Sequence, residues 1–186
     1  KLPIGGGLWS SARFHPEDAP ASALTEWTFD FPITRMPESA APKLGKNSSL
    51  VAMDVDVPAN ASGVLYALAG FSGGITTYMK DGFLNYEFNL FEVQRTKIKS
   101  KARLPLGKVK VESKLAGPIG GPMDITLRAN GEVVGQGRVP AAMSLHFTSN
   151  ATFDIGTGLD SPVSLDYYDQ APFAFNGGIG TTKITY

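Results

Sequence analysis

The chain has 186 residues, with 17 Lys or Arg against 17 Asp or Glu, so its formal net charge is zero. A neutral chain gives no global electrostatic reason to bind nucleic acid or a membrane surface. It contains no Cys, which excludes disulfides, thiolate nucleophiles and Cys-based zinc sites within it. No apolar run approaches the roughly 20 residues that a membrane helix needs. We therefore expect neither a nucleic acid nor a membrane as partner.

Residues 1–24 are predicted to form an N-terminal arm or linker ahead of one domain over residues 25–186. The arm contains three consecutive glycines and three prolines and shows no period of 2 or 3.6. The chain begins with Lys1 rather than Met, and no signal peptide is visible. We expect it to be a piece of a longer protein, cut by design or by proteolysis.

Short runs of alternating apolar and polar residues follow, each typical of a half-buried β-strand. In residues 25–31, Trp27 and Phe29 alternate with polar neighbours, and residues 50–57 repeat this pattern. Residues 64–69 are apolar throughout, which predicts a strand that is covered on both faces.

The next strands are expected in pairs that are joined by tight turns. Asp81-Gly82 and Asn130-Gly131 each separate two alternating runs, and both dipeptides favour the type I′ turn of a two-residue hairpin. The strands predicted in this part of the chain are 75–80, 83–90, 97–104, 108–115, 124–129, 132–137, 144–148, 152–155 and 179–186.

About eleven short strands without a convincing helix predict an all-β fold, an antiparallel β-sandwich or barrel. We expect a jelly roll of the concanavalin A or laminin G-like type. The Asn130-Gly131 hairpin and the closing run FNGGIGTTKI (residues 175–184) resemble laminin G-like sandwiches, in which the last strand returns beside the first.

Three segments, in this order, also resemble the C-terminal, non-catalytic β-sandwich domain of large bacterial arylsulfatases. The first, residues 34–43, contains TRMPE and APK; the second, residues 63–96, contains YMKDG and YEFN; the third, residues 153–177, contains FDIG, SPVS, APF and FNG. The resemblance covers roughly residues 25–186. It implies an accessory domain that packs on the arylsulfatase catalytic domain or on another copy of the chain, or that walls the active-site entrance. It implies a bacterial chain and leaves periplasmic, secreted and cytoplasmic locations open.

The resemblance also implies that the chemistry of the parent enzyme lies outside this chain. Arylsulfatases hydrolyse sulfate esters with a formylglycine, made from Cys or Ser in a Cys/Ser-x-Pro-x-Arg motif, beside a divalent metal ion that is expected to be calcium. Here there is no Cys, and none of the 13 prolines follows a Ser by two positions. We therefore assign no catalytic residue and no cofactor to the fragment itself.

Independent chemistry in the fragment is the least favoured hypothesis. Nucleophilic catalysis usually needs a His base, and the chain has only His15 and His146. His15 is expected to be a surface or packing residue, and His146 to face solvent from a strand. The glycine-rich residues 70–74 precede a strand rather than the helix of a phosphate-binding loop, and no paired-carboxylate motif of glycosidases is found.

Basic residues recur at every second position around residues 95–110. In strand register such residues share one face. If the two strands involved are neighbours, they form a basic plate that attracts an anionic partner such as a sulfated carbohydrate. The alternative is a solvated face whose lysines protect a sheet edge from aggregation. The residues of this predicted patch are Arg95, Lys97, Lys99, Lys101, Arg103, Lys108 and Lys110.

Four aspartates near the C-terminus are weak candidates for calcium, because oxygen-rich clusters can hold this ion. Their spacing matches no EF-hand loop, and turn chemistry or pairing with the basic strands is the alternative. The four are Asp154, Asp160, Asp166 and Asp169.

A lectin-like carbohydrate-binding module is the alternative to the accessory domain, because jelly rolls host many such modules. Sugar binding normally uses exposed aromatic rings together with polar loop groups. Tyr167, Tyr168, Phe173 and Phe175 are the aromatic candidates, although packing in the core or an interface is the stronger expectation for them.

Overall fold

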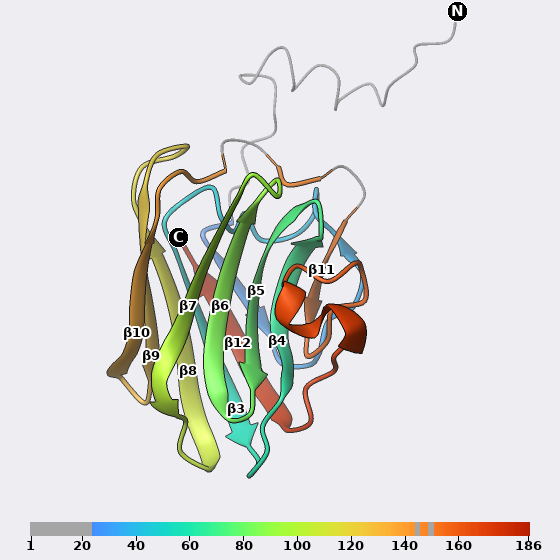
Figure 1. Ribbon diagram of the computed structural model, residues 1–186, viewed down its shortest axis with the longest axis vertical. Coiled ribbons are helices and arrows are strands. Elements are labelled where there is room, and N and C mark those ends of the chain that lie inside the picture. Colours follow the sequence, from blue (N-terminus) through green and yellow to red (C-terminus); the bar gives the residue numbers. More distant parts are fainter. Residues whose placement is uncertain (1–23, 144–145, 149–150) are drawn as a thin grey trace, which may run out of the picture.

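The computed structural model describes residues 24–143, 146–148 and 151–186. It places them in two six-stranded antiparallel sheets that pack face to face (Figure 1). Sheet A has the strand order β1-β12-β3-β8-β9-β10, and sheet B has the order β2-β11-β4-β5-β6-β7. The predicted all-β, antiparallel sandwich is confirmed.

The chain passes between the two sheets several times, with β4 to β7 consecutive in sheet B and β8 to β10 consecutive in sheet A. Sheet A contains β1 (Glu26–Phe29), β3 (Ser49–Val57), β8 (Gly107–Ala116), β9 (Met123–Ala129), β10 (Glu132–Val139) and β12 (Gly178–Thr185). Sheet B contains β2 (Met36–Pro37), β4 (Gly63–Gly70), β5 (Gly73–Lys80), β6 (Phe83–Leu90), β7 (Gln94–Arg103) and β11 (Thr152–Ile155). β12 pairs with both β1 and β3, so the last strand returns beside the first, as predicted.

The core lies between the sheets, where the long strands turn alternate apolar residues inward. On β3, Val51, Met53 and Val55 are at most 2% exposed, while the intervening Asp54 faces solvent. Phe153 of β11 is fully buried in the same cluster. Burying one such side chain stabilises the fold by about 1.5–3 kcal/mol. The period of two in the sequence therefore decides which face of each strand is buried.

The two predicted hairpin turns have the backbone that their residues favour. Asp81 and Gly82 have φ values of 52° and 81°, and Asn130 and Gly131 have values of 50° and 86°. Two successive positive φ values are typical of the type I′ turn, which Asx-Gly dipeptides adopt with little strain. These turns set the register of β5 against β6 and of β9 against β10.

A short second layer covers part of the outer face of sheet B. Residues 156–176 cross this face and include a 3₁₀ helix, η2 (Leu165–Gln170), which lies in front of β4 in Figure 1. Tyr167 of η2 packs with Val64, Ala67 and Tyr78 in a second buried cluster. β4 is consequently buried along its whole length, which confirms the prediction of a strand covered on both faces.

Two points about the strands differ from what the sequence predicts. The predicted basic plate required β7 and β8 to be neighbours, but β7 pairs with β6 in sheet B and β8 pairs with β3 and β9 in sheet A. The chain changes sheet between Arg103 and Gly107, where Leu104 enters the core. A period of two identifies the buried face of a strand but not its neighbour. Residues 146–148 form no strand, and residues 144–145 of that prediction lie outside the described residues.

The predicted arm, including His15, lies outside the described residues apart from residue 24. η2 is the short helix that the prediction of an all-strand chain missed. Within the described ranges, no helix is both long enough and apolar enough to span a membrane.

Candidate functional site

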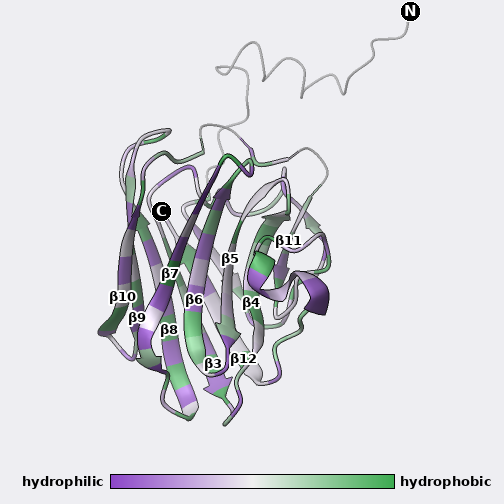
Figure 2. Ribbon diagram, viewed as in Figure 1, coloured by the Kyte–Doolittle hydropathy of each residue, from purple (hydrophilic) through white to green (hydrophobic). Residues whose placement is uncertain are grey.

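The outer face of sheet B is strongly polar next to the η2 layer. Alternate residues of β5, β6 and β7 point outward here, and hydrophilic residues lie along β7 in Figure 2. Register places Glu87 opposite Lys97, Asn85 opposite Lys99, and Asn89 opposite Arg95. We call the residues that share this surface the polar face: Tyr78, Lys80, Asn85, Glu87, Asn89, Arg95, Lys97, Lys99, Lys101 and Arg103.

Glu87 and Arg95 form a nearly buried ion pair at the centre of the polar face. Nη1 of Arg95 lies 2.9 Å from Oε1 of Glu87, and the side chains are 21% and 5% exposed, respectively. The guanidinium also donates to the carbonyl of Val163 at 2.6 Å and lies 5.2 Å from the centroid of the Phe71 ring. Because these three groups hold it, Arg95 has one preset orientation, which reduces the entropy lost when a ligand binds.

Asp166 of η2 connects the second layer to the polar face. Its carboxylate accepts the hydroxyl of Tyr78 at 2.6 Å and forms an ion pair with Lys97, while its backbone carbonyl accepts from Lys80 at 2.6 Å. Burial alone would raise the pKa of Asp166, but hydrogen bonds from Lys97 and Tyr78 outweigh burial and lower it. Burial and the bond to Asp166 both raise the pKa of Tyr78, so this phenol stays a neutral donor.

This contact predicts a pH dependence of stability that is specific to Asp166. Because its pKa is lower in the folded state than the reference value of 3.8, its stabilising effect is present above that value and is lost as the pH falls further. We expect Asp166→Asn to lower the unfolding free energy near neutral pH and the difference from wild type to shrink below pH 3.8. Urea unfolding of the wild type and the variant across this pH range measures the difference in unfolding free energy. A difference that stays constant with pH would contradict the assignment.

Aromatic rings border the polar face at both ends. Phe71 meets Tyr168 of η2 edge to face at 5.5 Å, and the Tyr168 side chain is 51% exposed. At the other end, Nζ of Lys99 lies 4.1 Å from the centroid of the Phe83 ring, which the Arg103 guanidinium approaches to 5.7 Å. An exposed ring beside fixed polar groups is the combination that sugar sites use.

The predicted aromatic candidates differ in their accessibility. Tyr168 is exposed, whereas Tyr167 is 2% exposed and stacks on Phe173 with ring centroids 5.1 Å apart. The Tyr167 hydroxyl donates to Thr76 at 3.0 Å, so this ring attaches η2 to β5. Phe175 packs against the main core. Three of the four rings therefore pack against other residues, and Tyr168 is the one whose ring is exposed.

The predicted basic patch is divided between the two sheets. Arg95, Lys97, Lys99, Lys101 and Arg103 lie on β7, where the buried Ile98 and Ser100 alternate with them as predicted. Lys108 and Lys110 lie on β8 in sheet A and therefore do not extend the polar face. A single plate made of all seven residues is wrong, because β7 and β8 belong to opposite layers.

Of the four aspartates proposed for calcium, Asp154 and Asp160 share the hydroxyl of Thr152 as a donor, and among the described residues the other two make no contact with them. Asp154 accepts from the backbone N–H of Arg35 at 2.6 Å, and Asp160 accepts from that of Thr152 at 2.6 Å. Asp166 belongs to the polar face, and Asp169 is exposed on η2. In the part of the chain that the structure describes, no group of three or more Asp, Glu or His residues has an arrangement that could hold a metal ion. The Asp166–Lys97 pair is the pairing with a basic strand that was one alternative, and the contact of Asp160 with Thr152 is local loop chemistry, the other alternative.

His146 is half-buried beside Glu38 rather than turned fully to solvent. Its Nδ1 lies 3.9 Å from Oε1 of Glu38, and burial lowers its pKa although Glu38 acts in the opposite direction. The Glu38 carboxylate accepts from the backbone N–H groups of Phe147 at 2.7 Å and Thr148 at 2.9 Å. Glu38 thus anchors the loop that contains His146.

Sequence reasoning missed the polar residues of β6 and the function of Asp166. Asn85, Glu87 and Asn89 alternate with the inward Leu84, Tyr86 and Phe88, and each of the three is at most 4% exposed. Three consecutive outward polar positions on a central strand were the available signal. Their burial could not be predicted, because it depends on η2 and on the long side chains of β7.

Comparison with known proteins gives the fold. No family model matches the sequence, and no curated protein does. Among solved structures, the chain is similar to the CBM40 domain of the Ruminococcus gnavus IT-sialidase bound to α2,3 sialyllactose, with a TM-score of 0.59, 13% identity, and coverage of 86% of this chain and 90% of that one. It is also similar to mouse laminin α1 domains LG4-5, with a TM-score of 0.54, 12% identity, and coverage of 86% and 40%.

A third similar structure is the leech intramolecular trans-sialidase complexed with 2,7-anhydro-Neu5Ac, with a TM-score of 0.57 and 13% identity. The match covers 86% of this chain and 25% of the leech enzyme. The fold is therefore a jelly-roll sandwich of the laminin G-like type, as predicted.

Proposed function

We propose that this chain is a lectin-like carbohydrate-binding module that takes acidic glycans on the polar face of sheet B. The observation that carries the proposal is the prearranged Glu87–Arg95 pair beside exposed lysines and the open ring of Tyr168. The exposed cations attract an anionic group, the Glu87 carboxylate holds Arg95 in place, and the open ring packs on a sugar face.

The charge of the polar face favours an acidic ligand over a neutral one. β7 contributes five cations, whereas Glu87 and Asp166 are the carboxylates in contact with them. Lys99 contacts the Phe83 ring and Lys101 is exposed, so both ammonium groups remain accessible to a ligand. The structural neighbours support this class, since one is bound to α2,3 sialyllactose and another is complexed with 2,7-anhydro-Neu5Ac.

A glycan array with the intact chain tests the proposal. It should compare sialylated, sulfated and neutral glycans, and we expect the acidic glycans to bind with an affinity that falls as salt rises. Lys99→Glu combined with Lys101→Glu should weaken this binding by at least about tenfold, because each reversal replaces attraction with repulsion. Lys97 is left in place because removing it would also unpair Asp166.

Lys114→Glu is the matched control, since Lys114 is an exposed lysine on β8 of the other sheet. It should leave acidic-glycan binding unchanged. Absence of binding to every acidic glycan, or equal binding by the reversed and control variants, would contradict the proposed function.

That the chain is the accessory domain of a bacterial arylsulfatase stays a separate proposal, which the sequence resemblance over residues 25–186 supports. It is compatible with glycan binding, because a module can hold the polymer on which a catalytic domain acts. The coding sequence upstream of Lys1 tests it. A Cys/Ser-x-Pro-x-Arg motif several hundred residues earlier would support the parentage, and a start codon directly before Lys1 would contradict it.

A further inference from the structure

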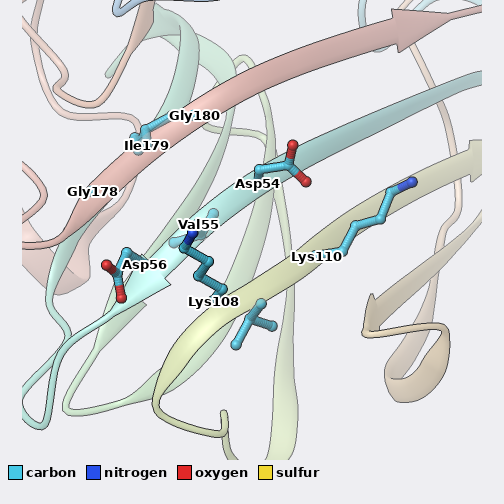
Figure 3. Close-up of a pocket in the computed structure, with 9 residues that line it drawn as sticks. Asp54, Val55, Asp56, Lys108, Lys110, Gly178, Ile179 and Gly180 are labelled. Carbon is cyan, nitrogen blue, oxygen red and sulfur yellow. The ribbon is translucent and has the colours of Figure 1, made fainter.

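A groove of about 460 Å³ lies on the outer face of sheet A, on the opposite layer from the polar face. It runs over the neighbouring strands β12, β3 and β8. Its chemistry comes from Asp54 and Asp56 of β3 and from Lys108 and Lys110 of β8, as Figure 3 shows. The groove shares no residue with the polar face, so a site here would be independent of the proposed function.

Two glycines of β12 keep the groove open. Gly178 and Gly180 lie next to the two aspartates, and a Cβ atom added to either would come within 3.2 Å or 3.3 Å of the Cβ of Asp56 or Asp54, respectively. Any larger residue would place a side chain over this wall of the groove. The sequence Gly-Ile-Gly therefore leaves the carboxylates of β3 reachable from the β12 side.

The four charged side chains keep their hydrogen-bonding capacity. Register places Asp54 opposite Lys110 and Asp56 opposite Lys108, and opposite charges in such positions usually pair. Lys108 extends over β3 between the two aspartates in Figure 3. Within residues 24–143, 146–148 and 151–186, however, none of the four forms an ion pair within 4.0 Å or a side-chain hydrogen bond.

The alternation of charge identifies the class of ligand. Two carboxylates and two ammonium groups sum to zero, so an anion or a cation would meet as many like charges as opposite ones. Carboxylates only accept hydrogen bonds and ammonium groups only donate them. A ligand rich in hydroxyl groups can satisfy both, because each hydroxyl donates and accepts without adding charge.

A peptide fits this groove less well. β12, β3 and β8 are each paired on both sides, so no strand edge is available for an added peptide strand. The lining contains only Val55, Val109 and Ile179 as apolar residues, which offer little to an apolar peptide side chain, and it contains no aromatic ring, so a sugar would be held here by hydrogen bonds alone, unlike on the polar face. We propose that the outer face of sheet A carries a second glycan-binding groove, selective for neutral oligosaccharides, which Asp54, Asp56, Lys108 and Lys110 bind.

Calorimetry and NMR with the intact chain test this site. The probes are neutral β1,4-linked hexasaccharides of glucose, xylose and mannose. At least one should bind with little salt dependence and shift the backbone amides of Asp56, Gly178 and Gly180. Asp54→Asn combined with Asp56→Asn should weaken this binding by at least about tenfold, because hydrogen bonds to charged acceptors are lost.

Both aspartates are exposed, so the double variant should remain folded. If the double variant has a lower melting temperature than wild type, Lys108→Ala serves as the second variant and should weaken binding of the same hexasaccharide. Lys99→Ala on the polar face is the control and should leave neutral binding intact. Binding by none of the three hexasaccharides, amide shifts confined to β6 and β7, or a self-association of the chain at this face would each overturn the inference. Acidic-glycan binding would survive those results, which separates them from failure of the proposed function.

Discussion

Replacing Arg95 with Met is expected to abolish acidic-glycan binding and to lower the unfolding free energy by about 2–3 kcal/mol. The loss of stability arises because Glu87, with a side chain only 5% exposed, would be left without its partner. The carbonyl of Val163 would also lose its donor. The expected loss of unfolding free energy is at the low end for a broken buried ion pair, because 21% of the Arg95 side chain is exposed. Urea unfolding and calorimetry measure the two effects.

The double variant Arg95→Met with Glu87→Leu separates stability from binding. Replacing both charges by apolar side chains removes the unpaired carboxylate, so most of the lost stability should return. Binding should not return, because neither replacement offers a hydrogen bond to a sugar. If the double variant is as unstable as the single one, the pair does not act as described. If the single variant binds normally, Arg95 is not part of the site.

Replacing Tyr167 with Ala is expected to cost about 3–5 kcal/mol of stability, the usual range for removing a buried aromatic ring. The ring lies between Tyr78 and Phe173, and its hydroxyl bonds Thr76. Without it, the η2 layer should detach from β4 and β5 and should expose them. Urea unfolding gives the energy, and hydrogen exchange of β4 amides reports the loss of cover.

Tyr167→Phe is the matched control for this change. It keeps the ring and removes the hydroxyl, so it should cost only about 1 kcal/mol, the net value of one hydrogen bond. Because η2 positions Asp166 against Lys97, the Ala variant should also weaken acidic-glycan binding while the Phe variant keeps it. Equal costs for the two variants would mean that ring packing does not hold this layer.

Most of the fold could be predicted from alternation and turn chemistry. β6 begins and ends at Phe83 and Leu90 as predicted, because Asp81-Gly82 determines the turn and three inward residues alternate along the strand. The buried run of β4 was also recognisable, since it lacks a polar face. The turn type and the alternation of apolar residues are local properties of the chain, so the local sequence is sufficient to predict them.

The candidate site could be predicted only in part, because it is assembled from residues far apart in the chain. Alternation in the sequence predicts that the lysines of β7 share one face. Their separation from Lys108 and Lys110 depends on which sheet each strand joins, which alternation does not encode. The sequence alone makes Asp166 a weak candidate for calcium, yet its carboxylate contacts Lys97 and Tyr78, 69 and 88 positions earlier in the chain. Such contacts depend on the tertiary fold.

The most direct test of the polar face is an NMR titration of the ¹⁵N-labelled chain with α2,3 sialyllactose. We expect the largest amide shifts on β6 and β7, around Asn85, Glu87 and Lys99, and on η2 at Tyr168. We expect small shifts on β3 and β8. Shifts concentrated on sheet A, or no shifts at saturating sugar, would contradict the claim that the outer face of sheet B binds acidic glycans.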